Sequence, residues 1–502
     1  MKVHQESQKF CSKVIGSVYL DPLGWTSTLA VRTQKGRLVQ ITTSGDRELP
    51  VATGTPLEVR GTWQGGSSAG EAAVAAAAST ATASRAMGST SSFRASSVRA
   101  TAQLRPRHHR PSVTRTAARG SASSVPPPLP RISNPVVEKD ISTIFIPIAA
   151  VVNPASQAST LCPGSSQPML TAAQLARVVF AEQNQANATV GSIFGTCSFG
   201  KSQLTQGNSR VADLVRLPCT DSSAGIPWSF ASCQIDDISG LADAADAVLR
   251  ARGVPLEKYK HRVYLLPPAG PSGCSFGGVG YIDCGSDMSF ECRSWIGAGF
   301  WGVPQVLAHE LAHNLGLEHS GSQNAAGQYD QYGDGSSLMG ACCSARCPST
   351  PQAWQLGWLN LAQLDGSRLA AGKTRRVALA SQDSSPDSGL RVQADWAPGV
   401  LPLFLGYRKQ AGGDGGMDGS LGSKVHVYRA DMGPRTASSP WMPAHTAWLT
   451  ALAVGESWED PPTGLVVSVD SAAGDSATVR ICRKGGADPT CGALLAQAKA
   501  SP

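Results

Sequence analysis

The sequence contains few charged residues, few aromatic residues and no long apolar segment. Only 16 % of its 502 residues are charged and 6 % are aromatic. The longest apolar run, residues 141–152, is shorter than a transmembrane helix requires and contains Pro147. The first residues of the chain also lack the apolar core of a secretory signal peptide. We therefore expect no transmembrane segment.

No CxxC pair occurs among the 13 cysteines, and this absence argues against a zinc ribbon. Twelve cysteines lie between Cys162 and Cys491, and Cys11 stands alone near the N-terminus. Scattered cysteines in loops rich in glycine and proline are typical of disulfides formed in an oxidising compartment. We therefore predict a secreted protein with disulfides among the twelve cysteines.

The chain also lacks a basic face, although its net charge is +7. Residues 61–135 hold nine Arg, no Lys and the single acid Glu71, so this segment carries +8 and the remainder about −1. Such a segment is either a solvated linker or a weak attachment to acidic polymers. Because no basic patch with interleaved aromatic residues occurs elsewhere, we expect no nucleic-acid partner.

The chain divides by composition into four regions. Residues 1–63 show short strand patterns between turns and predict a small β module. Residues 64–135 are rich in Ala, Ser, Arg and Pro and predict a disordered linker. Residues 136–365 mix strand and helix patterns, whereas residues 366–502 alternate short apolar runs with turns and predict an antiparallel β domain. The fold class is therefore mixed, α+β.

The third region contains well-separated element signals. We predict strands over residues 141–152, 192–200, 261–267 and 277–283. We predict helices over residues 171–184, 238–253 and 303–317. Thr171 is the expected N-cap of the first helix, and Pro304 falls in the first turn of the last.

Residues 309–319 read HELAHNLGLEH and carry the strongest chemical signal in the chain. His309 and His313 are four residues apart, so they project from one face of a helix. Gly316 can end that helix in the left-handed conformation, and the chain can then bring His319 round as a third ligand. Three imidazoles leave a fourth position open for water, which is typical of a catalytic zinc site. The pattern predicts one catalytic Zn²⁺.

Glu310 follows the first histidine and is the expected general base, because it can take a proton from that water and pass it to the leaving amine. The extended spacing HExxHxxGxxH is the metzincin pattern. Residues 332–340 read YGDGSSLMG, and Met339 follows the third histidine at about the distance of a Met-turn. A metzincin-type catalytic domain over residues 136–365 is therefore expected.

Four further positions are candidates for a role at the site, and three of them admit two interpretations. Tyr332 and Tyr329 are either packing residues or donors to the oxyanion that develops during peptide hydrolysis. Asp334 is expected to be a turn residue. Cys11 is either an unpaired cysteine or a thiolate that blocks the zinc in a latent precursor.

The chain also resembles the gametolysin family of metallopeptidases, peptidase family M11, the autolysins of volvocine green algae. The resemblance covers roughly residues 136–480 and is most specific over 262–358. Its matching segments are 262–268, 280–284, 292–295, 309–319, 332–340 and 354–358.

This resemblance implies a secreted zinc endopeptidase that acts on Pro- and hydroxyproline-rich glycoproteins of the cell wall or extracellular matrix. It also implies a propeptide, which the N-terminal β module and linker could represent. We expect a monomer whose partner is its protein substrate. The alternative is a matrix-binding wall protein with a non-catalytic or vestigial zinc site, and the presence of Glu310 favours the enzyme.

Overall fold

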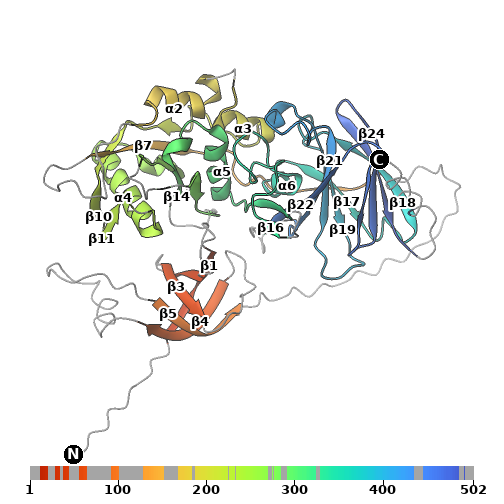
Figure 1. Cartoon of the computed structure of the whole chain (residues 1–502), viewed down its shortest axis with the longest axis horizontal. Helices are drawn as coiled ribbons and strands as arrows, with labels where there is room; N and C mark the ends of the chain where they lie inside the picture. Colours follow the sequence, from red (N-terminus) through yellow and green to blue (C-terminus); the bar gives the residue numbers. More distant parts are fainter. Residues whose placement is uncertain are drawn as a thin grey trace, which may run out of the picture. The chain divides into compact units, whose positions relative to one another are not determined.

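The computed structural model divides the chain into two compact units, residues 1–127 and 128–502, which are described separately (Figure 1). In the first unit it describes only five strands. In the second it describes residues 128–485 and Cys491, apart from 152–167, 184–186, 224, 232, 269–273, 275, 284–290, 324–327, 435–444 and 486–490. Cys11 and most of the predicted linker lie outside the described residues.

The strands of the first unit form a closed barrel in the order β1-β2-β3-β5-β4. They are β1 (Ser12–Leu20), β2 (Leu29–Thr33), β3 (Leu38–Thr43), β4 (Pro56–Gln64) and β5 (Ser92–Ala100). Strand β5 lies inside the segment that we predicted to be disordered. It pairs with both β3 and β4, so backbone hydrogen bonds on two sides stabilise a strand that its Ser- and Arg-rich composition does not reveal.

One sheet of the second unit has the order β13-β14-β12-β7-β8, with β9 also paired to β7. Its strands are β7 (Thr143–Val151), β8 (Arg210–Val211), β9 (Val215–Pro218), β12 (His261–Leu265), β13 (Gly278–Gly280) and β14 (Cys292–Ile296). Strand β12 runs parallel to β7 and β14, whereas β13 at the edge is antiparallel to β14. The strands predicted over 141–152, 261–267 and 277–283 are thus present.

Five α-helices are described in this unit: α2 (Ala172–Val179), α3 (Val190–Cys197), α4 (Ile235–Ala251), α5 (Pro304–Asn314) and α6 (Thr350–Gln355). Single 3₁₀ turns are η1 (Ala181–Gln183), η2 (Leu256–Lys258), η3 (Ala298–Phe300) and η4 (Gly412–Asp414). Helix α5 packs against β12, β13 and β14 and shares one apolar core with α2 and α3. Thr171 caps α2 as predicted, because its hydroxyl accepts a hydrogen bond from the Gln174 N–H at 3.2 Å. Among the described residues, no helix has the length and apolar composition that a membrane crossing requires.

The strand predicted over residues 192–200 is wrong, because this segment forms helix α3 and the turn after it. Thr189 and Ser192 make a reciprocal capping box, with N···O distances of 3.0 and 2.8 Å, that starts the helix at Val190, two residues before the predicted strand. Ile193 and Phe194 then pack into the core from the helix. Tertiary burial therefore overrides the strand preference of these side chains.

Two further sheets pack face to face in the C-terminal part of the unit. The larger has the order β16-β15-β22-β21-β20-β19-β17-β6 and the smaller the order β18-β25-β24-β23. The larger sheet contains β6 (Arg131–Ser133), β15 (Ser320–Gln323), β16 (Tyr329–Asp330), β17 (Asn360–Asp365), β19 (Leu390–Gln393), β20 (Leu403–Arg408), β21 (Lys424–Ala430) and β22 (Thr446–Leu452). The smaller contains β18 (Lys373–Ala380), β23 (Ser457–Asp460), β24 (Leu465–Ala473) and β25 (Ser476–Arg483). A separate hairpin joins β10 (Thr220–Ser223) to β11 (Ile226–Ser229).

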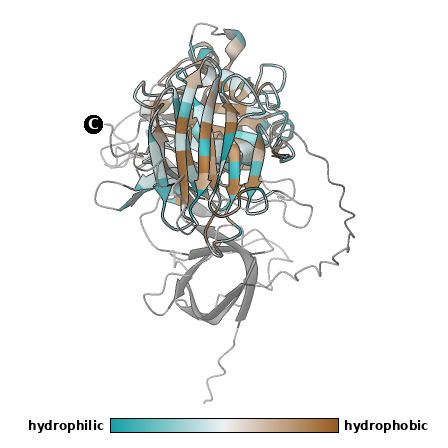
Figure 2. Ribbon diagram, turned by 90° about the vertical axis from the view of Figure 1, so that its right-hand side faces the viewer, coloured by the Kyte–Doolittle hydropathy of each residue, from teal (hydrophilic) through white to brown (hydrophobic). Residues whose placement is uncertain are grey.

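Apolar side chains of both C-terminal sheets form one core, which includes Leu405 and Val427 from the larger and Val467 and Val479 from the smaller. Figure 2 is viewed from the side of the C-terminal sheets and shows hydrophilic and hydrophobic positions interspersed along the strands. The antiparallel strands predicted over this region are present, but β15 and β17 each add a parallel pair from earlier in the chain. The larger sheet therefore includes strands from the segment that follows the HELAHNLGLEH motif.

Disulfides join described cysteines, as the composition predicts. They pair Cys197 with Cys347, Cys233 with Cys274, Cys342 with Cys343, and Cys482 with Cys491. The first of these connects α3 to the segment after Met339, across 150 residues of sequence.

Candidate metal centre

Helix α5 carries the first part of the motif and lies near the middle of the second unit (Figure 1). It lies within the predicted range 303–317 but ends at Asn314, Pro304 lies in its first turn as predicted, and every residue from Gln305 to Asn314 is buried. Gly316 has a φ of 93°, the left-handed conformation expected at the end of the helix, and its N–H donates to the His313 carbonyl at 2.7 Å. The reversal brings His319 back toward the helix.

The structure brings His309, His313 and His319 together as one buried group, the histidine triad. Their ligating nitrogens all lie within 4.8 Å of one another, and the Nε2 atoms of His313 and His319 are 3.2 Å apart. Zn–N bonds of about 2.0–2.1 Å in tetrahedral geometry place neighbouring nitrogens roughly 3.3 Å apart. The triad is therefore able to hold one metal ion of this size.

Hydrogen bonds fix the tautomer of each triad imidazole. Every Nδ1 donates to an oxygen: His309 to Leu338 O at 2.9 Å, His313 to Leu317 O at 2.7 Å, and His319 to Gln331 Oε1 at 2.9 Å. Because a neutral imidazole has one N–H, these bonds leave the Nε2 lone pairs unprotonated and directed at one another. Lone pairs 3.2 Å apart repel unless a cation lies between them, so the donor set fits a metal.

Burial also keeps the triad neutral, the form in which imidazole binds metals. Desolvation lowers the pKa of His309 to about 3 and the pKa of His319 to about 4. It lowers the pKa of His313 well below its ordinary value, and the two neighbouring imidazoles lower it further. In the protein without metal, protons therefore do not compete for these nitrogens near neutral pH.

The side chain of Glu310 extends from helix α5 toward the edge strand β13. It is only 5 % exposed, and a Cβ added at Gly278 would lie 2.4 Å from its Cγ and 2.5 Å from its Oε1. Only glycine therefore leaves room for this carboxyl group beside the strand. Burial raises the pKa of Glu310 to about 8, and a divalent cation on the triad would favour the ionised form.

Met339 is fully buried in the core that also contains Leu307 and Leu311 of α5. Its carbonyl accepts a hydrogen bond from the Ser320 N–H at 2.8 Å, next to His319. The preceding carbonyl, at Leu338, accepts from both His309 Nδ1 and Gln305 Nε2, at 2.9 and 3.1 Å. The predicted Met-turn segment thus contacts the triad through its backbone.

The two candidate tyrosines have different surroundings. The Tyr332 ring centroid is 4.2 Å from that of His319, and the side chain is 41 % exposed. Burial, assisted by Glu310 and Asp330, raises the pKa of Tyr332 to about 12, so its hydroxyl stays protonated. Tyr329 instead donates its hydroxyl to the Thr446 carbonyl of β22 at 3.3 Å. Tyr332 is therefore the tyrosine available to a molecule at the triad.

Asp334 begins the segment before Met339 and is fully buried. It has the hydrogen bonds of a turn residue, because it accepts from the Ser336 N–H at 2.8 Å and from the Ser336 hydroxyl at 2.6 Å. It also accepts from the Ser320 hydroxyl at 2.6 Å, which ties this turn to the residue after His319.

Arg408 of β20 reaches this turn from the larger C-terminal sheet. The side chain is completely buried and pairs with Asp414 through two bonds of 2.7 and 2.6 Å. It also donates to the Ser336 carbonyl at 2.9 Å and the Cys347 carbonyl at 3.3 Å. The Leu338 N–H donates to the same Cys347 carbonyl at 3.0 Å, and the Leu338 carbonyl accepts from His309 Nδ1. Arg408 is therefore linked to His309 through Cys347 and Leu338.

Sequence reasoning identified the triad, Glu310 and Met339, but it missed the residues that hold them. The sequence predicts a Gly-rich strand at Gly278 and no functional role for it, although a pair of glycines near a strand start is a signal of close approach. Gln331, Leu338 and Arg408 carry no such signal. Gln331 contacts His319 from twelve positions along the chain, and Arg408 lies 99 positions from His309. Leu338 acts through its backbone carbonyl, which any residue has.

Comparisons with known proteins show the family of the chain. The family model described as gametolysin peptidase M11 matches residues 158–440, more than half of the chain. An autolysin from Chlamydomonas reinhardtii is 32 % identical over 104 residues, which are 20 % of this chain and 15 % of that protein. The matched part therefore spans well under two thirds of the relative. On the family match, which confirms the resemblance found in the sequence, this chain belongs to the gametolysin peptidase M11 family.

Proposed function

We propose that this chain is a zinc-dependent endopeptidase in which Glu310 is the general base. The observation that carries the proposal is the triad, whose ligating nitrogens lie within 4.8 Å of one another and whose helix also carries the buried Glu310. Family membership supports peptidase chemistry at this site. The spacing HExxHxxGxxH with Met339 further supports a metzincin-type catalytic domain.

In this proposal His309, His313 and His319 hold one Zn²⁺. Zinc bound there lowers the pKa of a water molecule and polarises the scissile carbonyl. Glu310 takes the proton from the attacking water and delivers it to the amine that leaves. Its confinement against Gly278 keeps the carboxyl group in one position, so little reorganisation is needed during the proton transfers.

Tyr332 is proposed to donate its hydroxyl to the oxyanion, because the ring lies beside His319 and the group remains protonated. The replacement Tyr332→Phe keeps the ring and removes only the hydroxyl. We expect kcat to fall about a hundredfold with unchanged zinc content, in line with the loss of one oxyanion donor. An unchanged kcat would assign Tyr332 to packing.

Strand β13 offers a place for an extended substrate. Among the described residues its outer edge pairs with no strand, and its other edge pairs with β14. A peptide that adds to this edge forms backbone hydrogen bonds that do not depend on its side chains. Because Gly278 contacts Glu310, such a peptide would pass beside the proposed base.

We further propose a secreted monomer that cleaves Pro- and hydroxyproline-rich glycoproteins of the cell wall or extracellular matrix. The support is family membership together with the disulfides, which favour an oxidising compartment. Residues 1–127, the unit that contains the β barrel, are proposed to act as a propeptide. The division between a catalytic domain, 136–365, and a C-terminal β domain, 366–502, is likewise a proposal.

The test compares the full chain with its Glu310→Gln variant, which preserves the size of the side chain beside Gly278. Both proteins are loaded with zinc and assayed on a hydroxyproline-rich wall glycoprotein and on casein. We expect the variant to retain zinc and to lose at least about a hundredfold in rate. Cleavage of casein alone would refute the substrate class. Bound zinc without cleavage of either protein, also after proteolysis has removed residues 1–127, would favour the matrix-binding alternative.

A further inference from the structure

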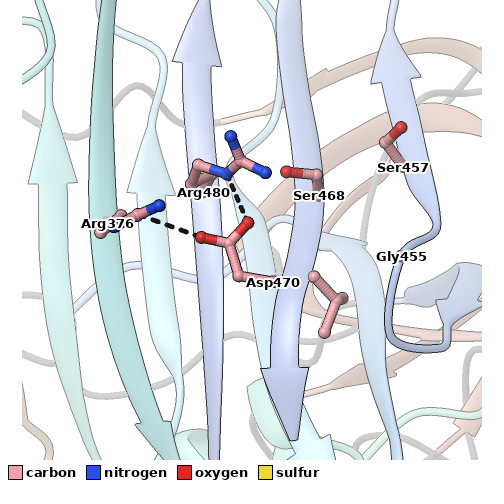
Figure 3. Close-up of a pocket in the computed structure, with 7 residues that line it drawn as sticks. Arg376, Gly455, Ser457, Ser468, Asp470 and Arg480 are labelled. Carbon is pink, nitrogen blue, oxygen red and sulfur yellow. Dashed lines mark hydrogen bonds and ion pairs between the residues drawn. The ribbon is translucent and has the colours of Figure 1, made fainter. Parts of the chain in front are cut away.

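The outer face of the smaller C-terminal sheet contains a polar hollow, far in sequence from the triad (Figure 3). Its volume is about 290 Å³, and its lining includes Arg376, Arg480, Asp470, Ser457 and Ser468. These residues come from β18, β25, β24 and β23, so every strand of the sheet contributes.

Four of the lining residues form one straight row across the sheet. Arg376 lies directly opposite Arg480, Arg480 opposite Ser468, and Ser468 opposite Ser457. Two arginines directly opposite each other destabilise an antiparallel pair. Asp470 offsets this repulsion by an ion pair with each, and its distance from Arg376 is 3.1 Å (Figure 3). One carboxylate between two guanidinium groups leaves a net charge of +1.

Ser468 adds a second unfavourable feature to the same hollow. The residue is only 6 % exposed, and its hydroxyl has no hydrogen-bond partner. In Figure 3 this hydroxyl points toward the guanidinium group of Arg480. A buried hydroxyl without a hydrogen-bond partner destabilises a fold. Proteins tolerate such destabilising features mainly at functional sites. The two arginines and the unpaired hydroxyl therefore indicate a binding site.

We propose that this hollow binds an acidic saccharide, a sugar unit that carries a carboxylate or a sulfate. Guanidinium groups bind such anions with charge-assisted hydrogen bonds, and Arg376 is accessible because 70 % of its side chain is exposed. Asp470 would repel a bare anion, but it can accept hydrogen bonds from sugar hydroxyls. Ser468 can both donate and accept.

The size of the hollow agrees with a single sugar unit. A volume of about 290 Å³ is at the lower end of the range for small-ligand sites. None of the lining residues is aromatic, so recognition rests on charge and hydrogen bonding and not on stacking. The site would hold the protein on an acidic polysaccharide and is independent of the proposed peptidase activity.

The test measures binding of three trisaccharides to the full chain by calorimetry: trigalacturonate, a sulfated carrageenan fragment and neutral maltotriose. Short ligands limit contacts with the Arg-rich segment 61–135. The variants are Arg376→Met, which changes an exposed side chain, and Ser468→Ala. The matched control is Arg368→Met, which removes another arginine that has one carboxylate partner outside the hollow. Thermal unfolding checks that each variant folds.

We expect at least one acidic trisaccharide to bind and maltotriose not to bind. Arg376→Met should weaken binding about tenfold or more, the effect of losing one charge-assisted hydrogen bond, and Ser468→Ala should also weaken it. Arg368→Met and Glu310→Gln should bind like the wild type, which separates this site from the peptidase. Binding of only the carboxylated or only the sulfated sugar identifies the preferred anion. Failure of both to bind, or equal binding by Arg376→Met, would overturn the proposal.

Discussion

Arg408 offers the clearest test of how the C-terminal sheet supports the candidate metal centre. We predict that Arg408→Met destabilises the fold and weakens zinc binding, although Arg408 contacts no triad residue. The replacement removes the donor to the Ser336 and Cys347 carbonyls and leaves Asp414, 1 % exposed, without its cation. Deletion of residues 366–502 should for the same reason disrupt the zinc site.

The magnitude follows from the burial of the ion pair. Breaking a buried pair by removing one partner costs about 3–5 kcal/mol, because an uncompensated charge remains. Loss of residues that orient a metal ligand lowers metal affinity by about 10–100-fold. Since Arg408 acts on His309 through Cys347 and Leu338, we expect the lower part of that range, about tenfold.

A double variant separates stability from positioning. In Arg408→Met with Asp414→Asn the buried charge is gone, and the amide oxygen of the new side chain can still accept the hydrogen bond from the Cys347 N–H, which Asp414 accepts at 2.8 Å. Urea unfolding should show that most of the stability returns, whereas competition with a zinc chelator should show that affinity does not. Recovery of both stability and zinc affinity in the double variant would refute the reasoning. So would a loss of unfolding free energy below about 1 kcal/mol in Arg408→Met alone.

Three further predictions concern the surroundings of the triad. Gly278→Ala places a methyl group 2.4 Å from Glu310 Cγ and should lower kcat at least about tenfold with zinc content unchanged; normal activity would contradict the proposed position of the base. Replacement of Cys197 and Cys347 by serine should lower the free energy of unfolding in urea by about 5 kcal/mol, because their disulfide closes a 150-residue loop, and a loss below about 1 kcal/mol would argue against that link. Metal-free protein should become less stable as pH falls from about 6.5 to 4, since the unfolded chain protonates imidazoles that the folded triad keeps neutral, with pKa values of about 3 and 4 for two of them. Glu310, with a pKa of about 8, and Glu318 and Asp334, whose pKa values desolvation also raises, oppose this trend. The contribution of the triad is therefore isolated by comparison with His309→Gln, whose urea-midpoint profile should fall less steeply over this pH range, and equal slopes would contradict the neutral triad.

The local parts of the site could be predicted from sequence. Helix geometry places His309 and His313 on one face, and the conformational freedom of glycine lets the chain turn at Gly316. These two effects are local, because they act within eleven residues. Strand β7 was predictable because its nine residues include no charged side chain, and helix α5 because Pro304 lies in its first turn and Gly316 follows its end. Family membership followed from the same dense group of motifs.

The non-local parts could not be predicted. Pairing of β15 with β22 joins residues more than a hundred positions apart and depends on the whole topology. The same holds for Arg408, which reads as an ordinary strand residue until the sheet places it beside Ser336. Helix α3 was mistaken for a strand because its capping box and buried surroundings outweigh the propensity of Ile193 and Phe194.

Zinc titration of the metal-free full chain tests the central claim most directly. Cleavage of a quenched peptide is followed while zinc is added, beside the Glu310→Gln variant. We predict that wild-type activity rises in proportion to zinc and reaches its plateau at about one ion per chain, and that the variant binds the same ion without cleaving. Full activity without metal, or equal activity in the variant, would contradict the assignment of the triad and of Glu310.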